Sequence, residues 1–319
     1  MRVQALFVLV AVTFAGLYFQ NTTHWSPADF ESYVAGTMQY PQALGTFRTR
    51  VLMPWVGRAV LAIPGADPAW TFRAVAVFCG WGILLAYRAF LGEYVRRDAA
   101  AGLATLIAWP LLWNYCLLNR LYFPFDLPAI LLTLLGCLAI RRRVWVATYA
   151  ILALATLNRE TGGFLIAVFA VCEWGRLSRG RWLGHLATQL ALWAGIVIGL
   201  RAAYGGGADL SSLDWLRGNA QTLLDMLALR GNALKDWAKL VLAFGGAWWL
   251  IPPAWRRLPD PVRRLCLAAV PLLIATAYRG ILDEVRVYGE LIPVVATPGI
   301  LWLAQKRGLA VAEIEEKLG

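Results

Sequence analysis

The sequence predicts an all-α fold, a polytopic transmembrane bundle of about ten helices forming a single domain over residues 1–319. Three observations support this fold class. Of the 319 residues, 60% are hydrophobic and only 15% are charged, and the mean hydropathy of +0.58 is too high for a soluble domain of this size. The 16 tryptophans suit the two bilayer interfaces, where amphipathic rings gather. The basic residues form short clusters between apolar runs, which is typical of membrane loops and argues against a nucleic-acid partner.

Each predicted span is an apolar run close to the length of about 20 residues that a bilayer core requires. The first run is too long for the apolar part of a cleaved signal peptide, so we expect it to remain as a span. The fifth and sixth spans are short, and we expect their connection at 158–163 to lie below the membrane surface, where it would line a protected cavity. The predicted spans are 3–20, 70–90, 99–118, 125–140, 144–157, 162–175, 183–204, 237–252, 264–278 and 288–304.

Two longer segments are expected to connect spans on the outer side. Residues 21–69 and 205–236, the first and fourth outer loops, each contain a helix-length amphipathic piece, and 50–63 is apolar enough to lie along the interface. The remaining connections are short. We therefore expect no separate soluble domain.

The charge distribution predicts the orientation, because retained cytoplasmic loops favour Lys and Arg. With the N-terminus in the cytoplasm, the inner segments hold 17 of the 30 basic residues and 7 of the 19 acidic residues. The outer segments hold the other 13 basic and 12 acidic residues, so they are nearly neutral. An even number of spans, with both termini cytoplasmic, fits this asymmetry.

Polar and charged residues that a membrane bundle should avoid gather at the predicted outer helix ends. Taken singly, they could be ion pairs that close helix ends, such as Arg159 with Glu160 or Arg286 with Glu290. Because four separate connections supply them on one side of the membrane, a shared functional cavity is favoured. Besides Arg159, Glu160, Arg286 and Glu290, the set contains Asp29, Glu31, Tyr33, Arg120, Asp126, Asn158, Arg279, Asp283, Glu284 and Tyr288.

The residue types in this set indicate group transfer with an anionic leaving group. Arginine binds phosphate oxygens through a planar fork and keeps its charge, so Arg159, Arg279 and Arg286 are candidates to hold a lipid phosphate or diphosphate. Asp29 could accept the proton of an attacking hydroxyl, with assistance from Glu31. Alternatively, this acid pair could hold a divalent metal, Mg²⁺ or Mn²⁺. The candidates for substrate binding are Tyr33, Arg120, Asp126, Asn158, Glu160, Asp283, Glu284 and Tyr288.

Three short segments resemble motifs of the polytopic glycosyltransferases of the GT-C class. They are 29–33 (Asp-Phe-Glu-Ser-Tyr) after the first span, 157–161 (Leu-Asn-Arg-Glu-Thr), and 283–288 (Asp-Glu-Val-Arg-Val-Tyr) followed by Pro293; 122–128 is a weaker match. The order of elements is similar to that class over nearly the whole chain. The matching motifs are those of bacterial members linked to cell-surface polysaccharide.

The resemblance implies transfer of a sugar from a polyprenyl-phosphate donor to a glycan or glycolipid acceptor, at the outer face of a bacterial inner membrane. By this resemblance Asp29 is the candidate base, and Arg286 and Arg279 are candidates for the donor phosphate. The chain departs from larger members of the class, which have a soluble outer domain at the C-terminus. This difference favours a lipid-linked or small glycan acceptor.

Two readings from other classes stay open. A transporter or flippase of an anionic or lipid-linked substrate would also need basic groups in a cavity, although repeated halves and ionisable residues at the midplane are not clear in the sequence. A non-catalytic scaffold of a polysaccharide assembly complex is the third reading. Neither a Gly-x-Ser-x-Gly elbow nor a glycine-rich phosphate loop is present, which argues against a serine hydrolase and a nucleotide-driven motor.

Overall fold

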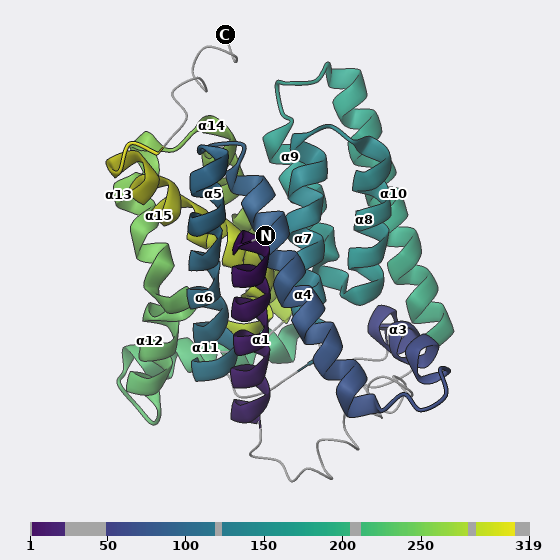
Figure 1. Cartoon of the computed structure of the whole chain (residues 1–319). Coiled ribbons are helices and arrows are strands. Elements are labelled where there is room, and N and C mark those ends of the chain that lie inside the picture. The colour runs from purple at the N-terminus through teal and green to yellow at the C-terminus, as the bar shows by residue number, and fades with distance from the viewer. Residues whose placement is uncertain (1, 23–48, 119–122, 205–211, 280–284, 310–319) are drawn as a thin grey trace.

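The computed structural model is a bundle of α-helices that stand side by side along one direction (Figure 1). It describes residues 2–22, 49–118, 123–204, 212–279 and 285–309, and these ranges contain no β-strand, as the sequence predicts. The longer helices are α1 (Arg2–Thr22), α4 (Pro68–Leu91), α7 (Asp126–Arg141), α8 (Trp145–Asn158), α9 (Phe164–Cys172), α10 (Arg179–Tyr204), α14 (Asp260–Arg279) and α15 (Ile292–Lys306).

Further helices and turns of helix lie between these. The two amphipathic helices expected in the segments 21–69 and 205–236 are present, as α3 (Leu52–Leu61) and α11 (Ser212–Leu227). The other short elements are α5 (Arg97–Ala104), η2 (Thr105–Ile107), α6 (Ala108–Leu112), the π-helix η3 (Trp113–Leu118), η4 (Glu160–Gly163), α12 (Ala233–Val241), η5 (Ala243–Leu250), α13 (Ile251–Ala254), η6 (Trp255–Arg257) and η7 (Val285–Leu291).

Five helical stretches are long and apolar enough to cross a membrane. They coincide with the first, second, third, seventh and tenth predicted spans. The other five predicted spans fall on helices that do not meet this length and hydropathy, so the count of about ten remains a prediction. The five stretches are Val3–Gln20, Trp70–Leu91, Arg97–Leu118, Arg179–Tyr204 and Val285–Lys306.

The most buried helices are α7 and α15, and α4 packs between α1 and α7, with α1 at the front of the view in Figure 1. The side chain of Asp67 accepts a hydrogen bond of 2.8 Å from the Trp70 backbone N–H, and Pro68 occupies the first turn, so α4 has a well-defined start. The buried Tyr87 hydroxyl lies 3.0 Å from the Thr297 hydroxyl, which joins α4 to α15 inside the apolar core. Such interhelical contacts matter in a bilayer, where lipid and helix surfaces are equally apolar.

The predicted span at 237–252 is interrupted in the structure. Between α12 and α13 the backbone takes left-handed conformations at Phe244, Gly245 and Gly246, with φ of 57°, 63° and 76°. The side chain of Asn114 accepts the Phe244 N–H at 2.9 Å, and the Trp109 indole donates to the Gly245 carbonyl at 3.0 Å. These contacts satisfy backbone groups that the interruption leaves outside a regular helix, a requirement at membrane depth.

A second interruption lies between α8 and α9, where the sequence predicts a connection below the surface. Asn158, Arg159 and Gly162 are buried within the bundle, and the depth of the connection in a membrane remains a prediction. The Trp193 indole of α10 donates a hydrogen bond of 3.0 Å to the Glu160 carbonyl, which covers part of the exposed backbone. The connection thereby brings polar groups into the interior of the bundle.

Candidate functional site

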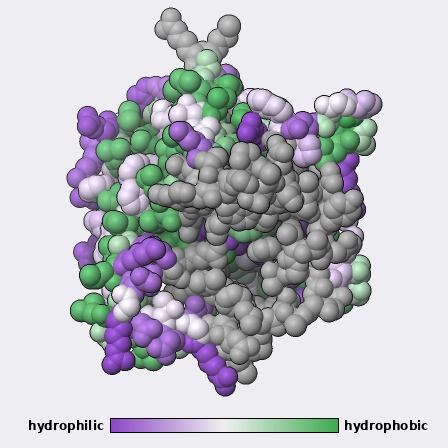
Figure 2. Space-filling view, turned by 90° about the horizontal axis from the view of Figure 1, so that it is seen from below, coloured by the Kyte–Doolittle hydropathy of each residue, from purple (hydrophilic) through white to green (hydrophobic). Residues whose placement is uncertain are grey.

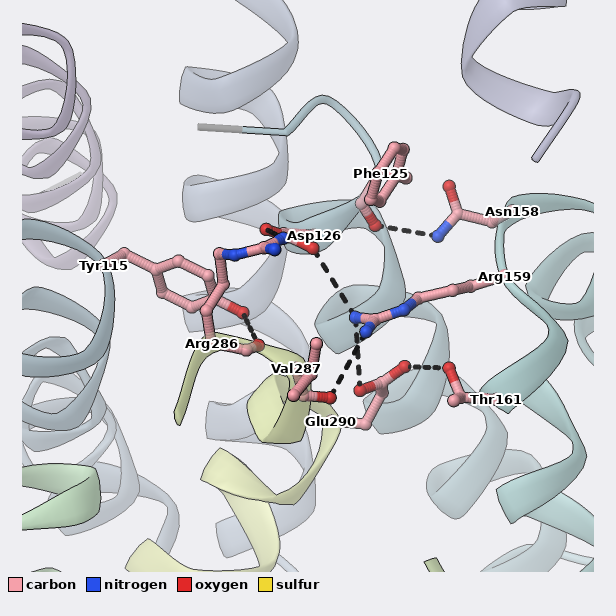
Figure 3. Close-up of polar contacts among 9 residues, drawn as sticks. All are labelled: Tyr115, Phe125, Asp126, Asn158, Arg159, Thr161, Arg286, Val287 and Glu290. Carbon is pink, nitrogen blue, oxygen red and sulfur yellow. Dashed lines mark hydrogen bonds and ion pairs between the residues drawn. The ribbon is translucent and has the colours of Figure 1, made fainter. Parts of the chain in front are cut away.

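A buried cluster of charged side chains is formed where α7 begins, α8 ends and η7 leads into α15. Asp126 is the first residue of α7, Arg159 follows the last residue of α8, and Arg286 and Glu290 lie in η7 just before α15. All four side chains are at most 4% exposed. Figure 3 shows that they point toward one another from three separate elements.

Asp126 is the centre of the cluster because its two carboxylate oxygens contact different arginines. One oxygen accepts a hydrogen bond of 3.0 Å from Arg286 Nη1, and the other lies 3.5 Å from Arg159 Nη1 (Figure 3). A single carboxylate therefore holds two guanidinium groups that are 127 positions apart in the sequence, from residue 159 to residue 286. Charge-assisted hydrogen bonds of this kind are among the stronger ones in proteins.

Arg159 joins this carboxylate to a second one. Its Nη1 lies 3.6 Å from Glu290 Oε2, and its Nη2 donates to the Val287 carbonyl at 3.3 Å. The Thr161 hydroxyl donates to Glu290 Oε1 at 2.5 Å, which fixes the orientation of that carboxylate. The two residues beside Arg159 in the connection, Asn158 and Glu160, have separate partners. Asn158 Nδ2 donates to the Phe125 carbonyl at 2.8 Å, and Glu160 pairs with Arg201 of α10 at 3.3 Å.

The backbone of η7 is held in place by the π-helix η3. The Tyr115 hydroxyl donates to the Arg286 carbonyl at 3.4 Å, and a Cβ atom at Gly289 would approach the same hydroxyl oxygen to 2.0 Å. Only glycine fits this contact, so the sequence of η7 allows the close approach that places Arg286 against Asp126. Tyr115 itself is fully buried and packs edge-on against Tyr18 of α1.

A third arginine adds positive charge to the cluster. The Arg50 guanidinium, just before α3, lies 4.3 Å from the centre of the Phe125 ring, and that of Arg286 lies 4.0 Å from the Phe123 ring. Burial, and then the nearby charge of Arg159, lowers the pKa of Arg50 to about 9, so this group is still charged at neutral pH.

Among the described residues, the cluster contains three guanidinium groups and two carboxylates. Buried charges are costly, and a buried ion pair seldom adds net stability. Guanidinium groups bind anionic oxygens well, so the arrangement can bind an anion and stabilise negative charge that develops on it.

The structure brings several of the residues predicted from the sequence together. Asp126, Arg159 and Arg286 meet as described above, and Tyr288 is buried in the same element as Arg286. Asn158 and Glu160 have the separate partners given above. For Arg279, at the end of α14, the structure describes the backbone only. Asp29, Glu31, Tyr33, Arg120, Asp283 and Glu284 lie outside the described residues, and so does the metal site considered for Asp29 and Glu31.

Four residues of the cluster were missed or assigned another part by sequence reasoning. Helical spacing predicts Glu290 as the partner of Arg286, whereas its carboxylate pairs with Arg159. Thr161 lies in the segment 157–161, whose sequence alone predicts no contact with Glu290. Nothing in the sequence distinguishes Arg50 from other loop arginines or Tyr115 from other aromatic residues of a span, because their contacts are all long-range.

Figure 2 shows the molecule from below the view of Figure 1, and hydrophilic and hydrophobic residues alternate around the rim of this face. Within the described part of the chain, no group of three or more His, Cys, Asp or Glu side chains could hold a metal ion. Comparison with protein-family models, with curated proteins and with solved structures gives no match.

Proposed function

We propose that this chain is a membrane glycosyltransferase of the GT-C type. It transfers a sugar from a polyprenyl-phosphate donor to a glycan or glycolipid acceptor at the outer face of a bacterial inner membrane. The observation that supports this proposal is the buried cluster of arginines and carboxylates around Asp126, built from elements distant in sequence within an apolar bundle. Ionisable groups at such a place are a functional-site hypothesis by default.

The donor phosphate binds beside Arg286 and Arg50. The guanidinium group of Arg286 is held by Asp126 at one nitrogen and stacks on Phe123, so its position is fixed before a ligand arrives. Arg159 adds charge, but its Nη1 and Nη2 atoms are already engaged by carboxylates and a backbone carbonyl. In this assignment Arg159 organises the site, while Arg286 meets the phosphate oxygens.

The reaction moves one sugar and one proton. The acceptor hydroxyl oxygen bonds to the anomeric carbon of the sugar, and the bond from that carbon to the phosphate oxygen breaks. The hydroxyl proton goes to a carboxylate, for which Asp29 is the candidate from the sequence. Polyprenyl phosphate leaves with the additional negative charge, which the arginine cluster stabilises.

The proposal includes about ten spans, because an even number of spans puts the more basic segments on the cytoplasmic side of the membrane. In this arrangement both termini are cytoplasmic, and the ends of α7 and α8 that hold the cluster face outward. The amphipathic helices α3 and α11 lie at the outer interface. The polyprenyl chain remains in lipid while its phosphate reaches the cluster from the side.

The test is sugar transfer by the purified chain in lipid vesicles, with labelled polyprenyl-phosphate sugars as donors and product formation as the readout. Replacement of Arg286 by Gln should lower transfer about 100-fold, the loss typical for one group that stabilises developing charge. Asp29→Asn should abolish transfer if the carboxylate is the base. The matched control is Arg142→Gln, at the other end of α7, where Arg142 pairs with Glu93 at 2.9 Å and is half exposed.

Two results would contradict the proposal. Equal transfer by the native chain and the Arg286→Gln variant would remove the cluster from catalysis. If no donor supports transfer but the labelled lipid crosses the bilayer, the chain is a flippase.

A further inference from the structure

Three polar atoms of the cluster have no hydrogen-bond partner within the described part of the chain. They are Asn158 Oδ1, Arg159 Nε and Glu290 Oε2, and each belongs to a side chain that is at most 4% exposed. Buried polar groups are nearly always hydrogen-bonded, so each of these three atoms calls for an explanation. The Glu290 oxygen has only the 3.6 Å ion pair with Arg159 Nη1.

The chemical type of these three atoms limits what can satisfy them. Asn158 Oδ1 and Glu290 Oε2 are acceptors, and Arg159 Nε carries a hydrogen and is a donor. A fully ionised phosphate has only acceptor oxygens, so it could satisfy the arginine but not the other two. A hydroxyl group donates one hydrogen bond and also accepts, which matches a set of two acceptors and one donor.

The two acceptors are held in fixed orientations by other contacts. Asn158 is anchored through its Nδ2, which donates to the Phe125 carbonyl at 2.8 Å. Glu290 is anchored through Oε1, which accepts from Thr161 at 2.5 Å. Since each side chain uses one end to bind protein, the other end keeps a defined direction for a ligand.

We propose that Asn158, Arg159 and Glu290 form a subsite for hydroxyl groups of a polyhydroxylated ligand. This proposal rests on the function proposed above, in which the ligand is the sugar of the donor. The cluster then has two parts, a cationic part at Arg286 and Arg50 for the phosphate and an acceptor-rich part for the sugar. The charge of the ligand is recognised in one part and its hydroxyl groups in the other.

The test compares the binding of two lipids to the full chain in nanodiscs. One is polyprenyl phosphate, and the other is the same lipid carrying a hexose. The ratio of their dissociation constants measures what the sugar adds. Glu290→Gln removes a negative charge and one acceptor, so the sugar-free lipid should bind at least as tightly, while the sugar's contribution should fall about 10-fold, as for a lost hydrogen bond to a charged group.

Asp126→Asn is the matched control. It removes the same charge from the same network, but both Asp126 oxygens already contact arginines, so no unpaired acceptor is lost. The affinities for the two lipids should therefore change by the same factor, leaving the ratio within about 2-fold of the native value. Arg159→Lys is a second test variant, which keeps the charge but removes Nε and should lower the ratio.

An unchanged ratio in both Glu290→Gln and Arg159→Lys would overturn the subsite, because water would then be its only occupant. If the native chain binds the sugar-free lipid but gains nothing from the hexose, the subsite is wrong and the phosphate site stands. If the native chain binds neither lipid, the proposed function fails. In that case the subsite is tested with a neutral alkyl glycoside. The subsite predicts that this glycoside binds the native chain and binds the Glu290→Gln variant about 10-fold more weakly.

Discussion

Replacing Asp126 by Leu tests whether this carboxylate is what keeps two guanidinium groups inside the bundle. The change leaves Arg286, 3% exposed, without the carboxylate that its Nη1 contacts at 3.0 Å, and it leaves Arg159 with Glu290 at 3.6 Å. Removing one partner of a buried ion pair costs about 3–5 kcal/mol, because the other charge stays buried without compensation. We expect the free energy of unfolding to fall by that amount.

The double variant Asp126→Leu, Arg286→Met separates this cause from a loss of packing. It removes both charges of the 3.0 Å pair from an apolar interior, and Arg159 retains Glu290 as its counterion. Apolar replacement of a whole buried pair is often close to neutral, so the double variant should recover most of the stability that Asp126→Leu loses.

The assay is unfolding by SDS in mixed micelles, followed by tryptophan fluorescence and helix content. Glu93→Gln serves as the control, because its ion pair with Arg142 is partly exposed and should change the unfolding free energy by about 0.5 kcal/mol or less. The reasoning is refuted if Asp126→Leu is as stable as this control. It is also refuted if the double variant loses as much unfolding free energy as the single variants Asp126→Leu and Arg286→Met lose together.

Three further outcomes are expected. Gly289→Ala should cost about 1–3 kcal/mol of unfolding free energy, because its Cβ would clash with the Tyr115 hydroxyl oxygen. Adding Tyr115→Phe should restore most of that free energy. If stability does not recover, the clash lies elsewhere. Asn114→Leu should cost about 1–3 kcal/mol in the same assay, because it leaves a buried N–H of the left-handed turn in η5 unpaired; a smaller loss than that of Asn114→Asp would contradict this. Impermeant maleimide added to intact cells should label Arg217→Cys of α11 and not Arg142→Cys, and the reverse pattern would invert the orientation.

Much of the helical architecture follows from the apolar periodicity of the sequence. Runs of about 20 apolar residues identify α1, α4 and α10 because bilayer thickness and helical rise fix that length. The interruption at 237–252 is harder to predict from the sequence, because the left-handed turn there depends on Asn114 and Trp109, which are about 130 positions away. Glycines 245 and 246 are consistent with a turn, but their sequence alone does not exclude a continuous helix.

The sequence predicts which residues form the candidate site better than it predicts which ion pairs they make. Counting spans predicts that Asp126, Arg159 and Arg286 lie on one side of the membrane, and the structure brings these three side chains together. Their partners do not follow from sequence spacing, because local rules favour Arg286 with Glu290 and the structure pairs Glu290 with Arg159. Pairing between elements is decided by how the helices pack, which a single sequence does not record.

Helix α10 has most of its surface facing outward, yet it supplies two polar contacts to the connection between α8 and α9. The Trp193 indole binds the Glu160 carbonyl at 3.0 Å, and Arg201 pairs with the Glu160 carboxylate at 3.3 Å. Both contacts reach the residue next to Arg159 from one peripheral helix. A shift of α10 would therefore release the backbone and the side chain of Glu160 together, so the geometry of the connection depends on a helix that has few contacts of its own with the core.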